Sequence, residues 1–145
     1  MKLYHGSKNG NLKTIKKQQA SAGEGVDVPK DELLEAIYLT PDYSFALACA
    51  VRPDGVSHIN ESPKTMEFEN PERFDPNVEV YIYEIDVPDS EVRQIDELQY
   101  VIENKDEVEI TEIFKHKAID VAQYYELLNW KRESQEGTGN QLKTR

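Results

Sequence analysis

One segment constrains the fold of this chain more than any other: residues 78–87, which read Val-Glu-Val-Tyr-Ile-Tyr-Glu-Ile-Asp-Val. Valine, isoleucine and tyrosine favour the pleated backbone of a β-strand. Both faces of this strand are largely apolar, which is typical of a strand that is covered on each side. The segment therefore predicts the central strand of a sheet, around which the rest of the chain is arranged.

The remaining strands are shorter and are read from β-forming side chains that lie between turn residues. Five segments have this pattern: 2–5, 36–40, 65–68, 98–103 and 108–114. The last two are separated by a polar turn and are expected to form a hairpin. Strands do not alternate regularly with helices, so the order favours an α+β fold built on antiparallel sheet.

Two helices are expected. Asp42 is suited to cap a helix of small residues that includes Ala46 and Ala50. Apolar residues recur at helical spacing over 118–131, which predicts an amphipathic helix packed on the sheet. Three stretches lack a sustained period and are expected to be loops or a single helical turn: 18–30, 31–35 and 52–64.

Length and composition predict one domain. A chain of 145 residues with 38% hydrophobic content can bury one core, which we place in residues 1–132, followed by a polar and flexible tail at 133–145. There is no apolar run long enough for a membrane span, and the N-terminus is too polar for a signal peptide, so a cytoplasmic location is expected. With one cysteine and three histidines, no metal site is predicted.

Charge is unevenly distributed along the chain. The net charge of −11 argues against sequence-independent binding to nucleic acid, which requires a basic surface. The first 20 residues, however, contain five lysines and no acidic residue. A ligand that carries phosphate would prefer this basic end, although a run of lysines is also what a solvated surface shows.

Three short motifs occur in order along the chain. Residues 4–7 read Tyr-His-Gly-Ser at the end of the first strand, 38–40 read Tyr-Leu-Thr before the small-residue helix, and 99–102 read Gln-Tyr-Val-Ile. This ordered set spans roughly residues 2–114 and resembles the ADP-ribosyltransferases that have a His-Tyr-Glu signature. The resemblance implies a split, antiparallel sheet core with flanking helices, NAD as substrate, and cleavage of its nicotinamide–ribose bond.

The chemistry of such a site suits the residues present. A tyrosine ring such as that of Tyr38 can stack on the cationic nicotinamide ring, a contact worth about 1–2 kcal/mol when desolvated. The backbone of Gly6 can pair with the nicotinamide carboxamide. His5 and Ser7 can bond the ribose hydroxyls or add a polar contact. The alternatives are a strand-end histidine satisfied by a neighbouring carbonyl and a tyrosine that belongs to the core.

The phosphates of NAD are expected to lie toward the basic segment, with Lys8 or Lys13 nearest. Ala46 and Cys49 stand where poly-ADP-ribose polymerases carry a serine and a second stacking tyrosine. The chain therefore looks closer to compact bacterial members of the family, such as the rifamycin-modifying enzymes.

The late strand departs from the family at its catalytic position, where Gln99 stands in place of glutamate. A carboxylate stabilises the positive charge that develops on the ribose, and an amide retains only the hydrogen bond, at a cost of about 3 kcal/mol or roughly a hundredfold in rate. In an extended strand Glu97 shares a face with Gln99, about 7 Å away, and is the candidate to supply the missing charge.

These observations favour a mono-ADP-ribosyltransferase that uses NAD and an unknown protein, nucleic-acid or small-molecule acceptor. A catalytically inactive relative that keeps the pocket as a nucleotide-binding or interaction module is the alternative that Gln99 suggests. A third interpretation is an acidic domain that binds a basic partner or mimics nucleic acid, for which a pI near 4.7 is suited.

Overall fold

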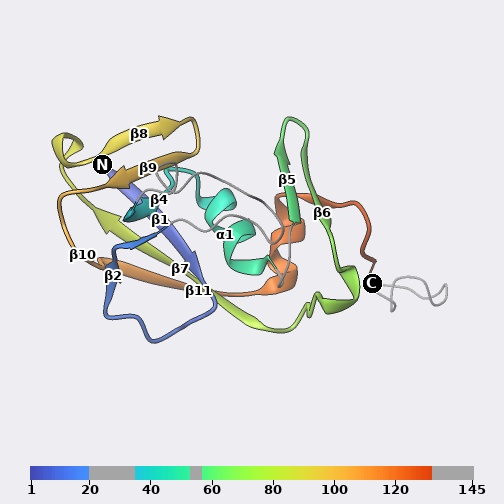
Figure 1. Ribbon diagram of the computed structural model, residues 1–145. Helices are drawn as coiled ribbons and strands as arrows, with labels where there is room; N and C mark the ends of the chain where they lie inside the picture. The colour runs from blue at the N-terminus through green and yellow to red at the C-terminus, as the bar shows by residue number, and fades with distance from the viewer. Residues whose placement is uncertain (20–34, 53–56, 132–145) are drawn as a thin grey trace.

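The computed structural model describes residues 1–19, 35–52 and 57–131, and β7 (Glu79–Asp86) lies at its centre (Figure 1). This strand runs antiparallel to β1 (Lys2–Ser7) on one side and to β11 (Glu112–Lys117) on the other. Four successive side chains of β7, from Ile82 to Ile85, are buried, so both of its faces are covered. The predicted central strand is confirmed.

A second antiparallel sheet has the order β3-β4-β9-β8, and the described residues also form two smaller sheets. The strands of the second sheet are β3 (Gln18–Gln19), β4 (Glu35–Leu39), β8 (Arg93–Asp96) and β9 (Gln99–Ile102). The smaller sheets pair β2 (Thr14–Lys16) with β10 (Glu107–Glu109), and join β5 (Ser57–Glu61), β6 (Lys64–Phe68) and β12 (Glu126–Leu127). The described chain is thus mostly β and largely antiparallel, as the α+β prediction required.

Helix α1 (Tyr43–Val51) packs against the first sheet. The Asp42 carboxylate accepts a hydrogen bond of 3.0 Å from the Phe45 backbone N–H, which satisfies one of the free donors of the first turn. The helix approaches β1 so closely that a Cβ atom on Gly6 would collide with the carbonyl oxygen of Ala46. The predicted small-residue helix beside the strand is confirmed, and its closeness requires glycine at position 6.

Two hydrophobic clusters lie on opposite faces of the first sheet. One cluster joins α1 to β6 and β7 and includes Leu47, Phe68 and Ile82. The other lies between β7 and the second sheet and includes Ile85 and Ile102. Because each cluster covers one face of β7, this strand holds the two sheets and the helix in a fixed arrangement.

The expected hairpin of segments 98–103 and 108–114 is wrong. Strand β9 pairs with β4 and β8, whereas 108–114 divides into β10, which pairs with β2, and β11, which pairs with β7. The division occurs at Thr111, whose N–H donates to the carbonyl of Glu84. Val108 packs in the cluster on one face of the first sheet, and Phe114 packs against the cluster on the other face. In one straight strand these two side chains would point to the same face, so the strand has to divide between them.

The predicted helix at 118–131 is also wrong. A short 3₁₀ helix, η4 (Ala118–Gln123), buries Ala118 and Val121, and the chain then pairs with β6 as β12. Asn129 continues this contact, because its side-chain amide accepts from the N–H of Phe68 and donates to the carbonyl of the same residue. Backbone pairing with β6 therefore replaces the helix that the apolar spacing suggested.

The remaining differences concern loops. The predicted loop at 52–64 contains β5, whose side chains alternate in burial because one face packs under the neighbouring elements. Gln18–Gln19 form β3, whereas most of the predicted loop at 18–30 and of the helical turn at 31–35 lies outside the described residues. The predicted tail at 133–145 lies outside them too. Two further 3₁₀ helices in the described chain are η2 (Pro71–Arg73) and η3 (Asp89–Glu91).

Candidate functional site

The two larger sheets meet at one backbone pair, between Tyr4 of β1 and Thr40 at the end of β4. Tyr4 and Thr40 exchange hydrogen bonds of 2.7 and 3.0 Å. In an antiparallel ladder the N–H and C=O of one residue point to the same side of the strand, and those of the next residue point to the other side. The N–H and C=O of Gly6 therefore point the same way as those of Tyr4, away from β7. Within the described residues, neither group of Gly6 has a hydrogen-bond partner.

A pocket of about 250 Å³, here called the edge cleft, opens at this point. Its walls come from β1, the end of β4, helix α1 and the hairpin of β8 and β9. It brings together four of the residues singled out from the sequence, which are His5, Gly6, Tyr38 and Gln99. Segments separated by more than thirty residues in the chain thus line one cleft.

His5 is fixed by a hydrogen bond from its Nδ1 to the backbone carbonyl of Tyr38, at 3.4 Å. A carbonyl oxygen only accepts, so Nδ1 carries the proton and the neutral ring presents Nε2 as an acceptor. Burial lowers the pKa of the imidazole, and the bond to Tyr38 offsets this only in part. His5 is therefore neutral at pH 7, satisfied on one nitrogen and able to accept on the other.

Tyr4 lines the edge cleft and packs against Tyr43, which is the first member of a hydrogen-bonded chain of side chains. The ring of Tyr43 packs edge-on against it, with centroids 5.3 Å apart. The Tyr43 hydroxyl lies 2.7 Å from Nε2 of His116, whose Nδ1 lies 2.9 Å from the Asp120 carboxylate. Burial, with smaller contributions from Tyr124, Tyr4 and Asp120, raises the pKa of Tyr43 to about 12, so its hydroxyl stays neutral and can donate to His116.

Helix α1 supplies one wall of the edge cleft through Phe45, Ala46, Cys49 and Arg52. The first, third and fourth of these lie on one helical face, since they are spaced by four and three residues. Burial raises the pKa of the Cys49 thiol, which therefore stays protonated at neutral pH. Sequence reasoning missed Arg52 as a site residue, although its spacing from Cys49 was visible.

Gln99 and Glu97 are placed differently. Gln99 is the first residue of β9 and lines the edge cleft beside Leu98. The expectation that Glu97 shares a strand face with Gln99 is wrong, because residues 97 and 98 form the turn before the strand and Glu97 is exposed there. None of the described residues that line the cleft carries a carboxylate.

A second depression of about 450 Å³, here called the basic groove, meets the edge cleft at His5. It is lined by Ser7 and by residues 9 and 11–17, which include Lys13, Lys16 and Lys17. Ser7 thus belongs to the groove rather than to the cleft.

The shape of the basic groove depends on a buried tyrosine of β7. The hydroxyl of Tyr83 donates to the carbonyl of Asn9 at 2.5 Å and accepts from the N–H of Leu12 at 3.3 Å. A Cβ atom on Gly10 would collide with the ring of Tyr81, so the loop lies directly on this strand. The segment that follows β1 is therefore held in place by the central strand.

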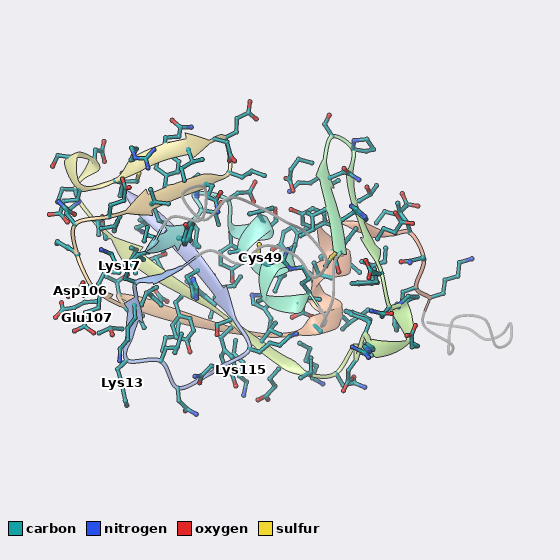
Figure 2. The ribbon with its side chains drawn as sticks, viewed as in Figure 1. Lys13, Lys17, Cys49, Asp106, Glu107 and Lys115 are labelled. Carbon is teal, nitrogen blue, oxygen red and sulfur yellow. The ribbon has the colours of Figure 1, made fainter. Side chains whose placement is uncertain are left out.

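The three lysines of the groove have different surroundings. Lys17 donates to the carbonyl of Glu103 at 2.7 Å, and Lys16 lies opposite Glu107 in the β2–β10 ladder. Figure 2 shows Lys13 projecting at the end of the loop, away from Asp106 and Glu107. Within the described chain Lys13 has no acidic partner, so its charge is the most available to a ligand.

Lys8 lies elsewhere. Its ammonium group donates to the carbonyl oxygen of Arg52 at the C-terminal end of α1, at 2.7 Å, and it lines neither the edge cleft nor the basic groove. Of the two lysines expected near the phosphates of NAD, only Lys13 lies in the groove.

Comparison of the chain with protein-family models, with curated proteins and with solved structures finds no match. In the part of the chain that the structure describes, no helix is long and apolar enough to cross a membrane. The same residues contain no group of three or more histidine, cysteine or acidic side chains arranged to hold a metal ion.

Proposed function

We propose that this protein binds NAD across the edge cleft and the basic groove and acts as a mono-ADP-ribosyltransferase. The observation that carries the proposal is the convergence of His5, Gly6, Tyr38 and Gln99 on one cleft. Two antiparallel sheets that are joined at a single residue pair also suit the split-sheet fold that the motif resemblance implies.

The edge cleft suits the nicotinamide riboside half of NAD. Tyr38 offers an aromatic face to the cationic ring, and Gly6 offers the carboxamide an N–H and a C=O that have no partner among the described residues. Nε2 of the neutral His5 ring accepts from a ribose hydroxyl. The ring, the carboxamide and one ribose hydroxyl of this half of NAD thus have partners of matching character in the cleft.

The basic groove suits the diphosphate and adenosine. It adjoins the cleft at His5 and holds three lysines in a chain whose net charge is −11. An anionic ligand is drawn to this groove because the remaining surface is predominantly acidic. Ser7 and Asn11 add hydrogen-bonding groups, and Leu12 adds an apolar one.

In the proposed reaction the bond between ribose C1′ and the nicotinamide nitrogen breaks, and its electron pair neutralises the charge of the leaving ring. A nucleophilic atom of the acceptor bonds to C1′ and releases its proton to water. The side-chain oxygen of Gln99 accepts from the ribose 2′-hydroxyl, a bond that strengthens as positive charge develops. The acceptor is a protein, a nucleic acid or a small molecule.

The second candidate is an inactive relative that binds NAD without cleaving it. It is favoured by Gln99, by the position of Glu97 in an exposed turn, and by the lack of a carboxylate among the described residues of the cleft. Release of nicotinamide from NAD separates the two candidates. An acidic partner-binding domain, the third interpretation, predicts that NAD has no effect on the melting temperature.

The state of His5 gives a prediction for pH. NAD affinity should be constant from about pH 8 to 7 and should fall below about pH 6.5, because protonated His5 cannot accept from the ribose and repels the nicotinamide cation. Burial lowers the pKa of folded His5, so its contribution to stability is likewise complete above about pH 6.5 and is lost as the pH falls. Calorimetric titration of NAD across this range measures the effect.

The His5→Gln variant is the control for this experiment, since its affinity should be weaker and independent of pH over the same range. A decline that begins above pH 7 would contradict the assigned neutral state of His5.

The basic groove gives a prediction for ionic strength. Lys13→Glu should weaken NAD binding several-fold at low salt and much less at high salt, since the interaction of exposed charges is screened. Lys131→Glu makes the same change in net charge in the C-terminal segment, which follows β12 beside β6, and should have little effect (Figure 1). Equal effects of the two variants on NAD affinity at low salt would show that the basic groove is not part of the binding site.

A further inference from the structure

Two separate groups of cations lie near the edge cleft, on opposite faces of β1. Side chains alternate along a strand, so His5 and Ser7 point to the face that carries the basic groove. Gly6 faces α1, and Lys8, which follows the strand, reaches the end of that helix through its hydrogen bond to Arg52. The strand itself therefore separates Lys8 from the lysines of the groove.

Lys8 and Arg52 form the second group, here called the rim pair. Arg52 follows α1, is exposed and lines the edge cleft, and its carbonyl oxygen accepts a hydrogen bond of 2.7 Å from the Lys8 ammonium group. The guanidinium group is exposed, and within the described residues it has no acidic partner. Arg52 and Cys49 both line the cleft, and the charge of Arg52 partly offsets the effect of burial on the pKa of Cys49, whereas Glu61 adds to that effect.

Part of this arrangement has a structural explanation. A lysine at the C-terminal end of a helix interacts favourably with the unpaired carbonyls there. The helix end explains the position of Lys8. It does not explain Arg52, whose guanidinium group contacts no helix carbonyl among the described residues. Guanidinium groups match phosphate and carboxylate oxygens with paired hydrogen bonds.

NAD carries a single diphosphate, and the basic groove already offers it lysines on the other face of β1. We propose that the rim pair binds an anionic group of the acceptor, so that the second substrate carries a phosphate or carboxylate near its nucleophilic atom. This inference rests on the proposed transferase function. It places the acceptor at the mouth of the cleft, next to the ribose that it attacks, with Arg52 as a residue that determines specificity.

The test follows the Nε–Hε resonance of Arg52 in ¹⁵N spectra of the full chain during titration with inorganic phosphate, and with acetate as the carboxylate probe. Each titration is run without NAD and with saturating NAD. We expect the Arg52 resonance to shift saturably in both conditions. Arg73, which is exposed in η2 and has no ion pair among the described residues, is the internal control and should not shift.

Substitution provides a second readout. Arg52→Gln should weaken phosphate binding by roughly tenfold or more, as loss of a charged hydrogen-bonding partner predicts, whereas Arg73→Gln should leave it unchanged.

Two results would overturn the inference. If saturating NAD abolishes the phosphate effect on Arg52, the rim pair serves the diphosphate of NAD and not an acceptor. If Arg52 does not shift, or shifts no more than Arg73, the rim pair is not an anion site. Failure of NAD itself to bind appears separately, as unchanged Tyr38 and His5 resonances on addition of NAD, and counts against the proposed function and not against anion binding at the rim.

Discussion

Replacing Gln99 by glutamate should increase the rate of NAD cleavage by about a hundredfold. Gln99 lines the edge cleft, and glutamate has nearly the same shape, so the change adds charge without altering packing. A carboxylate there faces the ribose as positive charge develops, and loss of such an interaction costs about 3 kcal/mol. The measurement is the rate of nicotinamide release from NAD by Gln99→Glu and by the unsubstituted chain.

Glu97→Gln is the matched control, two residues away in an exposed turn. Because Glu97 does not line the cleft, we expect its loss to leave cleavage unchanged. A lower rate would show that Glu97 supplies the charge that Gln99 lacks. If all three proteins bind NAD but release nicotinamide only at the uncatalysed rate, the transferase proposal fails and the inactive relative is the correct interpretation.

Replacing Tyr38 by alanine should remove most of the stabilisation that NAD confers. Stacking of a desolvated cation on tyrosine is worth about 1–2 kcal/mol, so NAD affinity should fall by roughly 5- to 30-fold. Tyr38 is only half-buried, whereas its neighbours Ile37 and Leu39 are buried, so the substitution should leave the fold intact. Melting curves of the variant with and without NAD measure both effects.

Tyr100→Ala is the matched control for Tyr38→Ala. Tyr100 is also half-buried, and it lies on β9, the strand that pairs with β4, but it does not line the edge cleft. It should lower the melting temperature without changing the response to NAD. If Tyr38→Ala instead unfolds the protein and His5→Ala has no effect on binding, Tyr38 is a core residue and the site is wrongly assigned.

The sequence predicts those helices and strands that are specified by their own residues. The β-forming residues on both largely apolar faces of residues 78–87 predict the central strand, and Asp42 with the small residues after it predicts α1. Long-range pairing has no such local signal. Residues 108–114 look like one strand until Thr111 bonds to Glu84, and residues 118–131 look helical until the chain pairs with β6.

The candidate site was also predictable in part. The resemblance that the three ordered motifs carry predicts that His5, Tyr38 and Gln99 meet, and these residues line one cleft. The role of Gly6 is larger than the sequence suggests, since close packing of α1 also requires glycine there. The prediction that Glu97 shares a strand face with Gln99 was wrong because strand β9 begins only at Gln99, and a local pattern does not show where a strand begins.

Binding of NAD by the cleft and groove can be tested without any substitution, from the melting temperature of the protein. A ligand that binds only the folded state at a hundredfold excess over its Kd adds about 2.7 kcal/mol of stability. For a chain of 145 residues this corresponds to a rise of roughly 5–10 °C. We expect such a rise with NAD, and a melting temperature that NAD leaves unchanged at every concentration would show that the cleft and groove do not bind it.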